Sequence, residues 1–182
     1  MEKYLILSAG GSGKRMGSEI PKQFLEIEGM PIIMHTILRF LEYDPDINVI
    51  LVLPESERAR WDNLCQKHKF EYSHTIVNGG DERFYSVKNG LRKIHSDSLV
   101  AIHDAVRPLV SVETIARCFS EAEKNGNAIP VIAPSESIRE LGTSFGNRGL
   151  NRDNIRLVQT PQIFKSDLLI SASDCAYSPH FT

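Results

Sequence analysis

A glycine-rich segment near the N-terminus carries its own cations, an arrangement suited to a polyanionic ligand. Residues 8–24 read SAGGSGKRMGSEIPKQF and follow the apolar run YLIL. Glycine lets backbone N–H groups approach a phosphate closely, and Arg15 and Lys22 could neutralise its charge. Ser8 stands where a Walker loop needs its first glycine, and Met16 where a dinucleotide fingerprint needs its third. Two interpretations therefore remain, a phosphate-binding loop of another kind or a solvated basic turn.

Two further polar clusters follow apolar runs of strand length. GGDERFYSV comes after HTIV, and HDAVRP comes after LVAIH. Asp81 could cap the helix that begins there, and Asp104 could hold a metal ion or a hydroxyl group. Arg107 could bind a phosphate, or it could simply pair with Asp104 across a turn. His103 is more typical of a structural hydrogen-bonding residue than of a general base.

These clusters need a sheet whose strands end at one edge. Short apolar runs, bounded by turn formers, alternate with helix-like patterns along the chain. Their continuous hydrophobicity predicts strands buried on both faces, as in a parallel sheet. The predicted strands are residues 4–7, 48–53, 74–77, 99–103 and 128–133. The alternation predicts a doubly wound, mostly parallel α/β fold, in which ligands bind beyond the carboxyl ends of the strands.

Helices are predicted where apolar residues recur at three- and four-residue spacing. The three apolar faces are Ile33, Ile37, Phe40 and Leu41; Phe84, Val87, Leu91 and Ile94; and Val112, Ile115, Ala116 and Phe119. Ser111 is the expected N-cap of the last helix, with Glu113 in its first turn and Gly126 at its end. Cys65 and His68 have metal-like spacing without a second pair nearby, which favours an ordinary helix surface.

Composition places the chain among ordinary globular proteins. It has 182 residues, 41% hydrophobic and 24% charged, with a formal net charge of −2. One domain is expected, and the lack of a basic excess argues against nucleic-acid binding. No apolar run approaches the roughly 20 residues of a membrane span, so no membrane partner is expected. Three scattered cysteines, Cys65, Cys118 and Cys175, favour a reducing cytoplasm over a disulfide framework.

Residues 135–156 interrupt the alternation of strands and helices. This segment is polar and rich in glycine and arginine. It is long for a simple loop and too polar for the core. We expect either a surface loop or an arm that leaves the body to embrace a second copy.

Taken together, the polar segments resemble a known enzyme family. AGGSGKRMG…PKQF is similar to the signature of nucleotidyltransferases that join a sugar or polyol phosphate to a nucleoside triphosphate. With GGDERFYSV, HDAVRP and TPQIF, the match narrows to the 2-C-methyl-D-erythritol 4-phosphate cytidylyltransferase family, over residues 3–182. The resemblance implies a Rossmann-like fold and cytidylyl transfer from CTP to that polyol phosphate, in isoprenoid synthesis. It also implies that pyrophosphate is released and that Mg²⁺ is bound mostly through the triphosphate.

Other functions remain as alternatives. Cytidylyltransferases that act on ribitol 5-phosphate resemble the chain through the same motifs. A non-catalytic CTP-binding module belongs to a different class. An NAD-dependent oxidoreductase fits the fold but not Met16.

The resemblance further implies roles for individual residues. The catalytic cations, which stabilise the α-phosphate and the leaving group, would be Arg15 and Lys22. The nucleotide would be bound by Ala9, Gly10, Gly11, Gly13, Gly80, Asp81 and Ser86. The acceptor would be held by Ser137, Arg152, Thr160 and Thr182 together with Asp104 and Arg107, with Arg152 and Thr160 on phosphate-binding positions. Asp104 is also the one side chain expected to touch the metal, and only weakly.

The sequence departs from the family at its end. It stops at SPHFT, where the family continues with a segment that contributes a lysine to the acceptor and the reacting phosphates. We therefore expect this chain to bind CTP better than it turns CTP over, and its sheet to lack part of its cover. The resemblance and the polarity of residues 135–156 also imply a homodimer formed through this arm.

Overall fold

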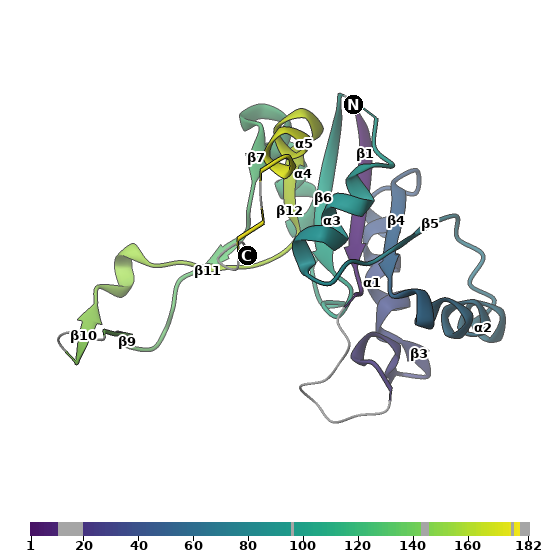
Figure 1. Cartoon of the computed structure of the whole chain (residues 1–182), viewed down its shortest axis with the longest axis horizontal. Coiled ribbons are helices and arrows are strands. Elements are labelled where there is room, and N and C mark those ends of the chain that lie inside the picture. The colour runs from purple at the N-terminus through teal and green to yellow at the C-terminus, as the bar shows by residue number, and fades with distance from the viewer. Residues whose placement is uncertain (11–19, 96, 143–145, 176, 179–182) are drawn as a thin grey trace.

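A six-stranded sheet forms the centre of the protein, in the order β5-β4-β1-β6-β12-β7 (Figure 1). This computed structural model describes the chain except residues 11–19, 96, 143–145, 176 and 179–182. The parallel strands are β1 (Glu2–Ser8), β4 (Asn48–Leu53), β5 (Thr75–Asn78) and β6 (Ser98–Asp104). The strand β12 (Gln162–Lys165) runs antiparallel to β6 and to β7 (Asn127–Ala128). The predicted doubly wound, mostly parallel fold is confirmed.

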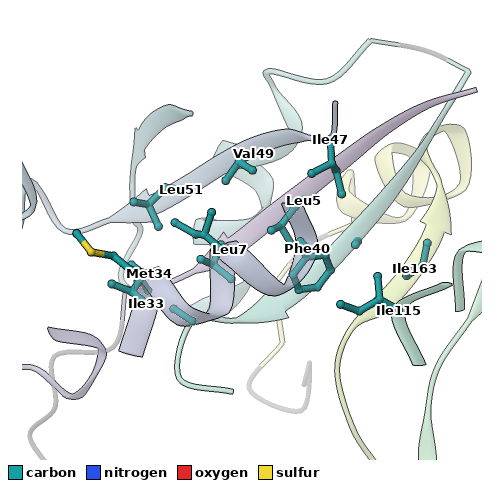
Figure 2. Close-up of a cluster of buried hydrophobic side chains, with 14 of the residues drawn as sticks. Leu5, Leu7, Ile33, Met34, Phe40, Ile47, Val49, Leu51, Ile115 and Ile163 are labelled. Carbon is teal, nitrogen blue, oxygen red and sulfur yellow. The ribbon is translucent and has the colours of Figure 1, made fainter. Parts of the chain in front are cut away.

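Helices cover both faces of the sheet because its central strands are apolar on both sides. Leu5 and Leu7 of β1 belong to a core shared with α1 (Ile32–Tyr43), α2 (Arg58–His68) and α4 (Val112–Asn125), and Figure 2 shows part of it. The alternate residues, Tyr4 and Ile6, pack with α3 (Arg83–Leu91) and α5 (Ser166–Ser173). The face predicted for α1 is buried, as are Ile115 and Phe119 of α4. In the face predicted for α3, Leu91 is buried, and Ile94 is buried but lies beyond the end of the helix.

The caps of α4 agree with the sequence, whereas that of α3 does not. The Ser111 hydroxyl accepts a hydrogen bond from the Thr114 N–H, and Gly126 ends α4 with φ of 90°. Asp81 was expected to cap α3, and this was wrong. The helix begins at Arg83 with Glu82 at the N-cap, and no side chain closes that end. Glu82 is extended, so Asp81 lies one residue too far away to cap.

The apolar run at residues 128–133 does not form one buried strand, which corrects the prediction. Ala128 ends β7 in the main sheet, whereas β8 (Val131–Ile132) leaves the sheet and pairs antiparallel with β11 (Leu157–Val158). Pro130 stands between β7 and β8 and has no N–H with which to continue a ladder. The four side chains of β8 and β11 are about half exposed.

Beyond β8 the chain forms an arm that projects from the body (Figure 1). Its outer part is a ribbon of β9 (Ile138–Leu141) and β10 (Asn147–Leu150), followed by a 3₁₀ turn at Arg152–Asn154. The chain returns through β11 and enters the sheet as β12. In the described part of the chain, no helix has the length and apolar character needed to cross a membrane.

Shorter elements complete the chain. They are η2 (Lys22–Phe24), β2 (Glu26–Ile27), β3 (Met30–Pro31) and η3 (Glu55–Glu57).

Candidate functional site

The predicted site residues gather where the parallel strands end. Because β1, β4, β5 and β6 run in the same direction, the segments that follow them leave the sheet at one edge. Backbone hydrogen bonds tie these segments together. The Ala9 N–H donates to the Val52 carbonyl at 3.0 Å, and the Ala105 N–H donates to the Ser8 carbonyl at 3.1 Å. The Gly79 N–H donates to the Leu53 carbonyl at 2.9 Å.

Two of the predicted nucleotide-binding segments touch at Ser86. The Gly80 N–H donates to Ser86 Oγ at 3.0 Å, which fixes the loop after β5 to the first turns of α3. A Cβ built on Gly10 would lie 3.3 Å from the same Ser86 Oγ. Gly10, Gly80 and Ser86 therefore form one continuous surface. Asp81 is exposed at its rim.

Gly80 lies where a side chain has no room. A Cβ on this residue would stand 2.4 Å from the Cβ of Tyr85 and 3.2 Å from the Tyr85 carbonyl carbon. Gly79 differs, because its Cβ would meet Ser86 Oγ at 3.4 Å, an ordinary contact. The second glycine of the pair is thus required by the close approach of the loop to α3.

The segment that carries Lys22 is fastened to the end of β1. The buried amide of Gln23 donates from Nε2 to the Ala9 carbonyl at 2.9 Å. Lys22 begins the η2 turn next to Gln23 and is partly exposed. This bond holds Lys22 at the same edge of the sheet as Ala9 and Gly10. A lysine there can contribute a positive charge to a phosphate bound beyond β1.

Asp104, at the end of β6, is held by two guanidinium groups. Arg107 Nε donates to Asp104 Oδ2 at 2.8 Å, and Arg83 Nη2 lies 3.5 Å from Asp104 Oδ1. Arg107 Nη1 also donates to Gln159 Oε1 at 2.8 Å. The turn pairing of Asp104 with Arg107 is therefore present. Arg83 adds a link from the start of α3 to the end of β6.

The interior behind Asp104 contains a buried histidine. His103 is fully buried, with Nδ1 2.9 Å from Thr160 Oγ1 and Nε2 3.2 Å from the Arg107 carbonyl oxygen. Burial lowers the pKa of His103 to about 4, so the ring is neutral near pH 7. The Asp104 N–H points at Thr160 Oγ1 at 3.5 Å. His103 is thus a structural hydrogen-bonding residue, as the sequence indicated, and Thr160 lies beside Asp104.

The structure does not bring Ser137 and Arg152 to this edge within one chain. Both lie on the projecting arm (Figure 1), where both are exposed. Arg152 Nη1 donates to the Ser135 carbonyl at 2.7 Å, so it stabilises the arm itself. Gly11, Gly13, Arg15 and Thr182 lie outside the described residues.

A divalent metal has few possible protein ligands in the described ranges. These ranges contain no group of three or more His, Cys, Asp or Glu side chains that could surround an ion. Asp104 lies at the end of β6, and each of its oxygens faces a guanidinium group. A metal at Asp104 would share the carboxylate with these arginines, whose positive charges oppose the binding of a cation. Cys65 and His68 both lie on α2, and burial raises the pKa of the Cys65 thiol to about 11.

Sequence reasoning missed several residues that build this edge. Arg83 was not singled out, because nothing in the sequence showed that the start of α3 lies against Asp104. Gln23 and Thr36 were missed for the same reason. Thr36 Oγ1 donates to the Ala105 carbonyl at 2.8 Å and is buried, so α1 supports the turn after β6. Gln23 could have been found from the sequence, because it lies in the PKQF segment next to Lys22.

Comparison with known proteins gives a consistent result. The family model described as "IspD: 2-C-methyl-D-erythritol 4-phosphate cytidylyltransferase" matches residues 4–182. The protein of that name from Azobacteroides pseudotrichonymphae is 49% identical over 181 residues, covering 100% of this chain and 81% of the relative. The Bacteroides fragilis protein is 48% identical over 182 residues, covering 100% of this chain and 83% of the relative.

A solved structure of the same kind superposes on the fold. The crystal structure of the Francisella tularensis 2-C-methyl-D-erythritol 4-phosphate cytidylyltransferase is 29% identical, with a TM-score of 0.77. The match covers 96% of this chain and 77% of that one. Fold, edge geometry and sequence agree, and the chain belongs to the 2-C-methyl-D-erythritol 4-phosphate cytidylyltransferase family.

Proposed function

We propose that the protein transfers a cytidylyl group from CTP to 2-C-methyl-D-erythritol 4-phosphate and releases pyrophosphate. The observation that carries this proposal is the identity of 49% across the whole chain to a relative of that name. The meeting of Gly10, Gly80 and Ser86 at the edge that also holds Asp104 supports it. The names of the relatives favour methylerythritol phosphate over ribitol phosphate as acceptor.

In this reaction an oxygen of the acceptor phosphate attacks the α-phosphorus of CTP, and pyrophosphate leaves. All reactants are anions, so the protein must hold like charges together and stabilise the charge that accumulates at phosphorus. We assign this work to Lys22 and Arg15, as the catalytic cations. The base would lie against Ala9, Gly10, Gly80, Asp81 and Ser86, with Gly11 and Gly13 completing the phosphate cradle.

We infer that Mg²⁺ is held mainly by the triphosphate of CTP. The paired carboxylate of Asp104 is better suited to orient the acceptor than to surround an ion. When bound, the ion would neutralise phosphate charge and leave the positioning to the side chains.

Ser137 and Arg152 require a second copy to take part in acceptor binding. Because the arm projects from the body, we infer that it reaches the strand edge of a partner chain (Figure 1). The exposed β8–β11 ribbon supports association, since Ile132 is 54% exposed and Val158 55%. A two-stranded ribbon alone is at best marginally stable in water, and burial against a second copy would stabilise it. We therefore propose a homodimer formed through the arm.

The three cysteines support a proposal for the location of the protein. Cys65, Cys118 and Cys175 are free. Free thiols are usual in a reducing compartment, and we propose the cytoplasm.

The test measures pyrophosphate release with CTP, Mg²⁺ and either polyol phosphate. We expect methylerythritol phosphate, and not ribitol 5-phosphate, to support release. Lys22→Ala should lower the rate while CTP still binds. Lys124→Ala is the matched control, because Lys124 pairs with Glu121 on the exposed side of α4. Equal rates for the two lysine variants would refute the role of Lys22, and release with ribitol 5-phosphate alone would refute the acceptor.

A further inference from the structure

His103 controls which way the hydroxyl group of Thr160 can point. The imidazole is fully buried at the end of β6 and makes a T-shaped contact with the Phe40 ring, at a centroid distance of 5.0 Å. Its two nitrogens face different partners, the Thr160 hydroxyl at Nδ1 and the Arg107 carbonyl oxygen at Nε2. One partner can donate or accept, and the other can only accept.

The carbonyl partner fixes the position of the ring proton. A carbonyl oxygen has no proton to give, so the contact at Nε2 is a hydrogen bond only if Nε2 carries the N–H. A neutral imidazole carries one N–H, which leaves a lone pair at Nδ1. The Thr160 hydroxyl must therefore donate its proton to Nδ1 across the 2.9 Å contact.

This leaves Thr160 Oγ1 with lone pairs only. A hydroxyl group has one proton, and here His103 takes it. The Asp104 N–H also points at Oγ1, at the longer distance of 3.5 Å. A phosphate dianion offers only acceptor oxygens, which repel a lone pair. A polyol offers O–H donors, which a lone pair attracts.

We propose that His103 is a positioning residue that makes Thr160 the partner of an acceptor hydroxyl group, and not of the acceptor phosphate. This inference rests on the proposed function, because it takes the acceptor to be a polyol phosphate. It changes the role that the resemblance implied for Thr160, which was a phosphate contact. The phosphate is left to arginine side chains, whose guanidinium groups donate only.

The first measurement reads the ring proton directly. The unmodified protein is labelled with ¹⁵N and ¹³C, His103 is assigned through the backbone, and its two ring nitrogens are observed in a long-range ¹H–¹⁵N correlation near pH 7. We expect the neutral ring with the proton on Nε2. A proton on Nδ1, or on both nitrogens, would free the Thr160 hydroxyl to donate elsewhere and would overturn the proposal.

The second measurement separates hydroxyl from phosphate recognition. Calorimetry measures binding of methylerythritol phosphate and of inorganic phosphate, with the nucleotide site filled by a non-hydrolysable α,β-methylene analogue of CTP. Thr160→Val keeps the shape and removes the hydroxyl. We expect this substitution to lower the affinity for methylerythritol phosphate about three- to tenfold, the usual effect of one neutral hydrogen bond. The affinity for inorganic phosphate should stay unchanged. Thr160→Ser, which keeps the hydroxyl, should bind both as the unmodified protein does.

The outcomes distinguish this inference from the proposed function. If Thr160→Val weakens the binding of inorganic phosphate as much as that of methylerythritol phosphate, Thr160 donates to phosphate and this inference alone fails. If it weakens neither, Thr160 does not touch the acceptor and the inference also fails. If the unmodified protein binds the CTP analogue but no polyol phosphate, the proposed function itself fails.

Discussion

Replacing Gly80 with alanine tests the close approach between the loop after β5 and the helix α3. The new Cβ would stand 2.4 Å from the Cβ of Tyr85. Carbon atoms in contact prefer roughly 3.5–4.0 Å, so the loop or the helix must move by about 1 Å. Overpacking of this kind costs about 1–3 kcal/mol of the free energy of unfolding. For a protein of this size, that corresponds to a fall in melting temperature of roughly 2–12 °C.

The same displacement should impair binding and turnover of the nucleotide more than it lowers the stability of the fold. Gly80 and Ser86 define the surface against which we place the base, and misplacing a binding surface by about 1 Å can cost on the order of 100-fold in activity. Melting is followed by circular dichroism, CTP binding by calorimetry, and activity by pyrophosphate release. Gly79→Ala is the control, because its Cβ makes only an ordinary contact at 3.4 Å. If the two alanine variants melt and bind CTP alike, the close approach at Gly80 does not hold the loop, and the reasoning is refuted.

Three further predictions concern the other parts of the site. The folded pKa of His103 is about 4 against an ordinary value of 6.5, so only the unfolded chain takes up this proton between those pH values. The free energy of unfolding should therefore fall by about 3 kcal/mol as the pH drops through that window, and chemical denaturation of His103→Gln should show a weaker dependence. Asp104→Asn removes the negative charge that pairs with the guanidinium groups of Arg107 and Arg83. We expect turnover to fall about tenfold while the affinity for CTP stays unchanged. An equal loss of turnover and of CTP affinity would contradict this prediction. Val158→Asp places a charge on the β8–β11 ribbon and should give monomers in light scattering, whereas Leu168→Asp on α5, 49% exposed, should not.

The central sheet could be predicted because its strands are buried on both faces. The run NVILVL is β4 residue for residue, and LVAIH lies within β6. Burial on both sides leaves no polar positions, and this gives a continuous apolar signal. The same signal failed at residues 128–133, because exposed apolar side chains look identical to core side chains in a sequence. The exposed Val131 and Ile132 make that difference visible.

The short elements near the C-terminus were not predicted at all. The strand β12 has four residues, of which Ile163 alone is fully buried, so it carries little periodic signal. Its place in the sheet comes from antiparallel pairing with β6, which is a contact between distant segments. The pairing of Arg83 with Asp104 was hidden for the same reason. Glycine and cation motifs indicated the edge of the sheet, but the bonds that assemble it depend on the fold.

The arm is inserted between two strands that are neighbours in the sheet. Ala128 of β7 pairs with Ile163 of β12, so the chain departs and returns about one strand spacing apart, roughly 5 Å. The Gln159 N–H donates to the Pro130 carbonyl at 2.9 Å and closes the base of the insertion. Such a clamped insertion can lengthen, shorten or be exchanged for a tight turn while the register of the sheet stays the same. The arm can therefore change independently of the loops that meet at the carboxyl ends of the parallel strands.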